Sequence, residues 1–115
     1  MTHNMSLQPV PFEKIKNGTK TVEMRLNDEK RRLIKVGDTI EFTNAADSNC
    51  TVRCIVTGLF PFDSFADLYR TLSLADCGYD ASEIHSAKPE DMELYYTKDE
   101  QKKYGVLGIG IKVII

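Results

Sequence analysis

The feature that most restricts the fold of this chain is the alternation of apolar and polar residues. It occurs in several short runs that are separated by turn signals. A period of two places apolar side chains on one face of a β-strand and polar side chains on the other. The clearest run is 105–115, where Leu107, Ile109, Ile111 and Val113 are in phase. Further strands are predicted over residues 3–8 and 19–26, around Ile40 and Phe42, and over residues 51–59. The chain is therefore expected to be built mainly from strands.

Helical signals occur between these strands. One helix opens at the prolines near residue 9 and ends at Asn17-Gly18, and a second begins at Asp63 or Ser64. A third helical stretch covers residues 89–96 and is expected to extend toward residue 103. Strands combined with two or three flanking helices suit an α+β fold, in the form of a small mixed β-barrel.

The length and composition favour one domain. A chain of 115 residues can enclose one hydrophobic core but not two, so residues 1–115 are expected to form a single domain. The segment 77–89 lacks periodicity and is expected to be irregular. Three cysteines, without a signal-like N-terminal segment, indicate a reducing, cytoplasmic location. No apolar run approaches the roughly 20 residues of a membrane helix, so no membrane partner is expected.

Basic residues are concentrated in one part of the chain. Residues 14–35 contain eight lysines and arginines and three acidic residues, a net charge of +5, whereas the rest of the chain carries a net charge of −7. Such a basic segment can attract phosphate groups, and the alternative is an ordinary solvated surface. The cysteines and His3 and His85 lack the spacing of a metal site, and no glycine-rich phosphate loop occurs. No metal or cofactor is therefore expected.

Four segments carry a resemblance to a known family. They are NGTKTVEMR at residues 17–25, LNDEKRR at 26–32, VGD at 36–38 and KYGVLGI at 103–109. Together they resemble the signature of the ASCH domain, the activating-signal-cointegrator homology domain. The resemblance implies a PUA-like β-barrel whose Lys, Glu and Arg face a ligand, either RNA or a nucleotide or nucleoside. It does not imply one reaction, because some small bacterial members resemble acetylcytidine amidohydrolases and others are linked to RNA cleavage.

The run 19–26 carries the residues expected to contact this ligand. Glu23 and Arg25 are two positions apart on a predicted strand and therefore share a face with Thr21. The carboxylate is expected to recognise a base edge, and the guanidinium to hold phosphate or stack on a base. An ion pair without a ligand is the alternative. Strict alternation places Lys20 on the opposite face, so its participation requires a bulge or twist where the strand begins.

An enzyme, either a nucleoside deacylase or a ribonuclease, is the second interpretation. Lys20 would then activate water or a hydroxyl group, and Glu23 would transfer protons. In the amidohydrolase branch a threonine follows the lysine by three positions, but this chain has Glu23 there. Thr21 is the nearest hydroxyl group, and Glu83 is the candidate for a downstream catalytic carboxylate. Binding is therefore the first prediction and hydrolysis the second.

Peripheral contacts are predicted from two other groups of residues. Arg31 and Arg32 are expected to contact phosphate at the mouth of the cleft, with a solvated turn as the alternative. Tyr104, together with Tyr95 and Tyr96, offers rings on which a base can stack, although packing is the commoner role for such residues. Both a monomer and a dimer are compatible with the sequence.

Overall fold

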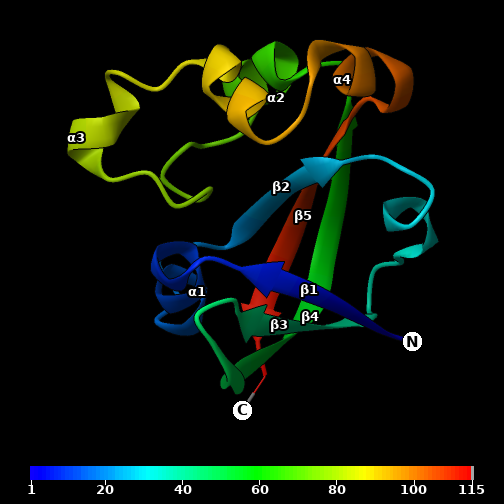
Figure 1. Ribbon diagram of the computed structural model, residues 1–115, viewed down its shortest axis with the longest axis vertical. Coiled ribbons are helices and arrows are strands. Elements are labelled where there is room, and N and C mark those ends of the chain that lie inside the picture. The colour runs from blue at the N-terminus through cyan, green and yellow to red at the C-terminus, as the bar shows by residue number, and fades with distance from the viewer. Residues whose placement is uncertain (115) are drawn as a thin grey trace.

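A computed structural model describes residues 1–114, which form one five-stranded sheet covered by helices (Figure 1). The strands follow the spatial order β1-β3-β4-β5-β2. The β1–β3 pair is parallel and the other neighbouring pairs are antiparallel. Their bounds are β1 (Thr2–Leu7), β2 (Val22–Leu26), β3 (Thr39–Asn44), β4 (Asp47–Phe62) and β5 (Val106–Val113). The sheet curls into a half-barrel whose two edges are β1 and β2, which confirms the predicted α+β class and the mixed sheet.

Helices occupy the connections. The described residues contain four α-helices, compared with the two or three predicted, and two short 3-10 helices. They are α1 (Pro9–Lys16), η1 (Arg31–Leu33), α2 (Phe65–Thr71), α3 (Ala81–Ile84), η2 (Pro89–Leu94) and α4 (Lys98–Tyr104). Figure 1 shows α2 and α4 together at one end of the sheet, and α1 beside β1 and β3 at the other.

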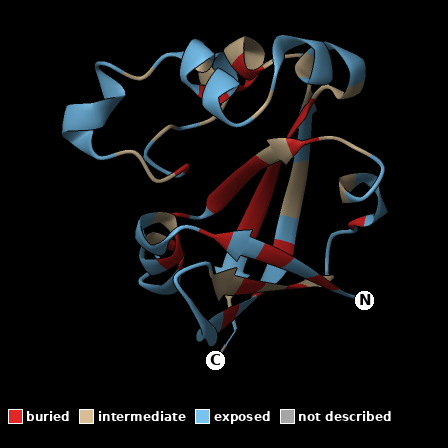
Figure 2. Cartoon of the chain, viewed as in Figure 1, coloured by how far each residue is buried: buried red, intermediate tan, exposed pale blue. Residues whose placement is uncertain are grey.

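Two apolar clusters lie on opposite faces of the sheet. The larger cluster fills the half-barrel beneath α1 and includes Phe12, Ile15, Phe42 and Ile109. The smaller cluster joins one face of β2 to α2 and η2 through Met24, Leu68, Met92 and others. Because β5 contributes to both clusters, residues 106–111 are all buried, and Figure 2 shows this strand as a continuous buried segment.

The strand β4 bends so that it can pair with two neighbours. Its first half pairs with β3, its second half pairs with β5, and the register shifts between Val56 and Gly58. Gly110 of β5 lies at this point, where an added Cβ would be only 2.7 Å from Thr57 Oγ1. A glycine therefore allows the two backbones to approach closely at the bend.

Several predicted boundaries differ from the structure. The second strand begins at Val22 instead of residue 19, and the segment 77–89 contains the one-turn helix α3. The predicted stretch 89–103 is divided, because Thr97 caps a new helix by accepting a hydrogen bond from the backbone N–H of Glu100 at 3.1 Å. The last strand ends at Val113, and the predicted position 115 lies outside the described residues.

Candidate ligand-binding site

Strand β2 presents an apolar face and a charged face, as its alternation predicted. Glu23 and Arg25 pair with Ile109 and Leu107 of β5, and directly opposed residues in an antiparallel pair share a face. Glu23 and Arg25 therefore lie on the inner face of the half-barrel, next to the larger core. Met24 and its apolar neighbours lie on the opposite face, against the helices.

Lys20 reaches the same region because it precedes the strand. The backbone N–H of Lys20 donates to Lys14 O at 2.9 Å, and those of Thr21 and Val22 both donate to Asp76 O. These bonds turn the chain after Gly18, which has a positive φ of 85°. Strict alternation thus does not extend to Lys20, and its side chain points toward Glu23. The twist that the sequence required is located here.

Glu23 is held between two cations in a buried ion network. Lys20 Nζ lies 2.9 Å from Glu23 Oε1. Arg25 donates to Glu23 Oε2 from Nε at 3.0 Å and from Nη2 at 2.8 Å. The exposed side-chain fractions are 9% for Lys20, 5% for Glu23 and 15% for Arg25. We call these three residues the ionic triad.

The triad keeps Glu23 ionised. Burial by itself raises the pKa of a carboxylic acid, because a charge is costly away from water. The positive charges of Lys20 and Arg25, and their hydrogen bonds, more than offset this effect and lower the pKa of Glu23 below its ordinary value. Near neutral pH the carboxylate is therefore an acceptor of hydrogen bonds and carries no proton to donate.

The triad borders a cavity of about 480 Å³, within the usual range for small-molecule sites. Its walls come from the end of β1, from α1, from β2, from residues 77–83 and from residues 92–96. Three basic residues (Lys14, Lys20, Arg25) and two acidic residues (Glu23, Glu83) line it, so its net charge is +1. The basic segment 14–35 supplies all three of these cations.

The segment after Cys77 forms one wall of the cavity and is fastened to α1. Lys14 Nζ donates to Gly78 O at 2.6 Å and lies 3.5 Å from Glu83 Oε1 and 3.6 Å from Asp80 Oδ1. Gly78 has a φ of 99°, and an added Cβ would be 2.9 Å from Lys20 Cδ. The wall therefore packs directly on the stem of the Lys20 side chain and restricts its position.

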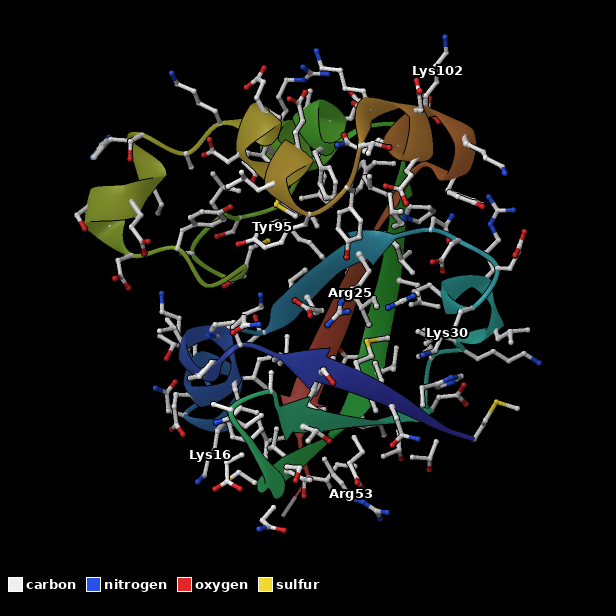
Figure 3. The ribbon with its side chains drawn as sticks, in the orientation of Figure 1. Lys16, Arg25, Lys30, Arg53, Tyr95 and Lys102 are labelled. Atoms are coloured by element: carbon white, nitrogen blue, oxygen red, sulfur yellow. The ribbon has the colours of Figure 1, made fainter. Side chains whose placement is uncertain are left out.

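Aromatic rings form another part of the cavity wall. Tyr96 stacks against Phe65 with a centroid distance of 6.1 Å, so it belongs to the smaller core as well as to the cavity. Tyr95 also lines the cavity but is 70% exposed. Figure 3 shows Tyr95 on the helical part of the molecule and Arg25 on β2. An exposed ring at a cavity mouth provides a surface on which a base can stack.

The other predicted site residues lie outside the cavity or have structural partners. Thr21 is exposed and does not line the cavity. Glu83 lines it but accepts a hydrogen bond from Asp80 N in the cap of α3, and this bond and Lys14 lower the pKa of Glu83. Arg31 pairs with Asp28 at 3.2 Å. Neither Arg31 nor Arg32 lines this cavity.

Arg32 and Tyr104 instead connect two segments of the chain. The guanidinium of Arg32 donates to Asn27 O at 2.8 Å and to Tyr104 O at 3.3 Å. The Tyr104 ring packs against the smaller core and lies 5.0 Å from Lys103 Nζ. Tyr104 is thus a packing residue in this structure, and of the three tyrosines only Tyr95 and Tyr96 line the cavity.

Sequence reasoning missed several residues of the cavity. Lys14, Gly78 and Tyr79 come from segments that the pattern placed in a helix or left irregular. The one available signal was a glycine at the start of an aperiodic segment, which is typical of a positive φ or a close approach. The pairing of Lys14 with residue 78 spans 64 positions, and no local pattern could reveal it.

The described residues were also compared with the requirements of a metal site and of a membrane-spanning helix, and they meet neither. Among residues 1–114, no three metal-binding side chains come together. No helix in this described range is long and apolar enough to cross a membrane.

Comparisons of the sequence and of the structure with known proteins point to the same family. The family model of the ASCH domain matches residues 5–115. The hypothetical protein PH0355 is 33% identical with a TM-score of 0.81, and the alignment covers 99% of this chain and 100% of that one. Protein PF0455 from Pyrococcus furiosus is 31% identical with a TM-score of 0.72, covering 99% and 98% of the two chains.

More distant structures share the fold. The ASCH domain from Lactobacillus crispatus is 14% identical with a TM-score of 0.65, and the alignment covers 97% of this chain and 79% of that one. This likeness confirms the PUA-like half-barrel. No curated protein matches the sequence significantly.

Proposed function

Because the chain belongs to the ASCH domain family, to which RNA binding is generally ascribed, we propose that its cavity takes up an unpaired base of single-stranded RNA. The observation that carries the proposal is the ionic triad, which lies buried at the wall of a cavity of about 480 Å³. Buried charged groups are costly to a fold, and their clustering in a cavity is typical of binding sites.

The hydrogen bonds of the triad assign different roles to its members. Each Glu23 oxygen already accepts two hydrogen-bonding contacts, Oε1 from Lys20 Nζ and Met24 N and Oε2 from the two nitrogens of Arg25. A carboxylate has about four lone-pair positions, so little acceptor capacity is left for a base. Glu23 therefore acts as a positioning residue and not as the reader of the base edge.

Lys20 and Arg25 retain donors that can contact the ligand. A lysine ammonium has three N–H donors and an arginine guanidinium has five. Within residues 1–114, the acceptors for these two cations are the Glu23 carboxylate and Ser6 O, and neither accepts from Arg25 Nη1. The site thus favours a ligand with acceptors, such as the keto oxygen or unprotonated ring nitrogen of a base. Tyr95 and Tyr96 supply the faces on which its ring can stack.

The same geometry favours binding over hydrolysis. Position 23 carries an ionised carboxylate where the amidohydrolase branch has a hydroxyl group, and Thr21 lies outside the cavity. Glu83 is engaged by the cap of α3 and by Lys14. Thr21, the candidate nucleophile, therefore does not share the cavity with Lys20, and Glu83, the candidate carboxylate, already has other partners. The enzymatic interpretation would require both residues to act together with Lys20.

The test is the affinity for a short single-stranded RNA of mixed sequence, measured by fluorescence anisotropy. Replacing Lys20 with methionine removes a buried charge-assisted donor, which contributes about 1.5–3 kcal/mol, and is expected to weaken binding about tenfold or more. Lys16→Met is the matched control, because Lys16 is an exposed lysine of α1 that does not line the cavity (Figure 3). Equal losses in the two variants would refute the proposed site.

A second pair of variants tests stacking without changing charge. Tyr95→Ala is expected to weaken RNA binding, whereas Leu94→Ala, at a neighbouring residue that is 86% exposed, is expected to leave it unchanged. Thermal unfolding of every variant shows whether the fold is intact. Cleavage of the RNA by the wild-type protein, abolished in Lys20→Met, would overturn the binding function in favour of an enzyme.

A further inference from the structure

The two edges of the half-barrel meet at a seam that one side chain bridges. The strands β1 and β2 are the first and last of the sheet order and do not pair with each other. Arg25 Nη2 of β2 donates to Ser6 O of β1 at 2.9 Å. The guanidinium therefore satisfies a carbonyl group of an edge strand and joins the two edges at this position.

A second hollow lies along this seam. Its volume is about 200 Å³, and it shares Ser6 and Arg25 with the large cavity. The large cavity also includes residues of α1 and the 77–83 wall, whereas the hollow includes residues of the connection after β2. Arg25 thus lies between two concave sites. The polar side chains of the hollow are Asn4, Ser6, Arg25, Lys30, Arg31 and Thr43.

The charge of the hollow is positive. Three of its lining residues, Arg25, Lys30 and Arg31, are cations, and no acidic residue lines it. Arg25 and Arg31 are partly neutralised by Glu23 and Asp28. In the described part of the chain Lys30 forms no ion pair, and its side chain is exposed at the edge of the hollow (Figure 3). The three lining cations and their two acidic partners together have a net charge of +1.

One buried donor in this region lacks a partner. Arg31 Nε has almost no exposed surface and no hydrogen-bond acceptor among residues 1–114, although Nη1 of the same group donates to Asp28. A buried donor without an acceptor is unfavourable, and native proteins seldom retain one without a reason. Hydroxyl and amide side chains beside three cations form the donor set that phosphate oxygens prefer.

We propose that this hollow binds a phosphodiester group of the RNA strand whose base enters the large cavity, which rests on the proposed function for the identity of the polymer. Arg25 contacts both sites and fixes their relative positions. Lys30 and Arg31 supply the additional donors, and Thr43 supplies a hydroxyl group from β3. The protein then binds a base and an adjoining phosphate on the two sides of one guanidinium.

The experiment uses the whole protein with two probes, inorganic phosphate and a short single-stranded RNA. Lys30→Gln is the main variant, since Lys30 is exposed and its replacement leaves the core intact. Lys35→Gln is the matched control, an exposed lysine of the same connection that lines neither site. In NMR titrations, phosphate is expected to shift the backbone amides of Lys30, Arg31 and Thr43, and less so in Lys30→Gln.

For the RNA, Lys30→Gln is expected to lower the slope of log affinity against log salt concentration by about one, whereas Lys35→Gln leaves it unchanged. Phosphate shifts elsewhere, or equal slopes in both variants, would overturn the phosphate site. RNA binding that depends on Lys20 but not on Lys30 would refute this inference and keep the proposed function. Phosphate binding that depends on Lys30, with RNA affinity independent of Lys20, would refute the proposed function and keep only the phosphate site.

Discussion

The replacement of Glu23 by glutamine tests whether the ionic triad is the buried network that the structure shows. The substitution keeps the shape of the side chain but removes its charge, leaving Lys20 and Arg25 as neighbouring cations. Breaking a buried ion pair by removing one partner costs about 3–5 kcal/mol. A glutamine oxygen can still accept a hydrogen bond from one of the two cations, so we expect the lower end, about 3 kcal/mol. For a domain of this size that corresponds to a decrease in Tm of about 12 °C.

Urea unfolding followed by circular dichroism measures this loss against a surface control. Glu41 pairs with Arg53 at 3.0 Å, as closely as Glu23 pairs with its partners, but the side chains of Glu41 and Arg53 are 29% and 63% exposed. Exposed pairs contribute only about 0–1 kcal/mol, so Glu41→Gln is expected to have little effect. If Glu23→Gln loses no more free energy of unfolding than Glu41→Gln, the charges of the triad are solvated and the reasoning is wrong.

The pH dependence gives an independent check with a defined sign. The pKa of Glu23 is lower in the folded protein than its ordinary value of 4.5. A carboxylate of this kind stabilises the fold fully above its unfolded pKa, and this stabilisation is lost as the pH falls through the folded pKa. The difference in stability between wild type and Glu23→Gln is therefore expected to be constant near neutral pH and to shrink below about pH 4.5. A difference that does not change in acid would contradict the lowered pKa.

Two further predictions concern the cavity wall and the cysteines. Gly78→Ala should lose more stability and more RNA affinity than Gly18→Ala, as measured by unfolding and by fluorescence anisotropy. Both glycines have a positive φ, but only the new Cβ at position 78 approaches Lys20, at 2.9 Å from Cδ. Equal losses in the two variants would show that the contact with Lys20 is unimportant. A thiol reagent should modify only the exposed Cys50 in the folded protein and all three cysteines after unfolding. The reason is that Cys54 and Cys77 are buried, and burial raises the pKa of each thiol to about 11. Fast modification of Cys77 in the folded protein would show that the cavity wall opens readily.

Local sequence patterns predicted the strands, the faces of β2 and a helix cap, because each of these depends on residues close together in the chain. Alternation located β2 and β5 and correctly divided β2 into an apolar and a charged face. Of the two expected helix caps, Asp63 and Ser64, the structure has Ser64, whose hydroxyl accepts a hydrogen bond from Asp67 N at 3.2 Å. Strict alternation does not describe Lys20, as the expected twist required, because the bonds of Lys20 N to Lys14 O and of Thr21 N and Val22 N to Asp76 O turn the backbone before the strand begins.

The hydrogen bonds of Glu23 and the packing of Tyr104 could not be predicted from the sequence, because they depend on contacts between distant parts of the chain. Glu23 was expected to read a base edge, and this role stays a prediction. Its carboxylate accepts four contacts from three residues, Lys20, Met24 and Arg25, and the side-chain directions of Lys20 and Arg25 depend on the folded chain. Tyr104 resembled Tyr95 and Tyr96 in sequence, and only packing separates it from the cavity. Residue type therefore indicated Lys20, Glu23 and Arg25, which line the cavity, but not how their donors and acceptors are paired.

The placement of the triad also explains why an open sheet suits this site. On the inner face of β2, positions 23 and 25 lie beside Leu107 and Ile109, where apolar residues would simply extend the core. Charged residues there contribute less stability than apolar packing would, because buried ion pairs rarely recover their desolvation cost. They occur where β1 and β2 do not pair, so Arg25 can hold the two edges together through Ser6 and still face a hollow on either side. A closed barrel would pair the backbones of β1 and β2 along this seam, so Ser6 O would no longer need the Arg25 guanidinium.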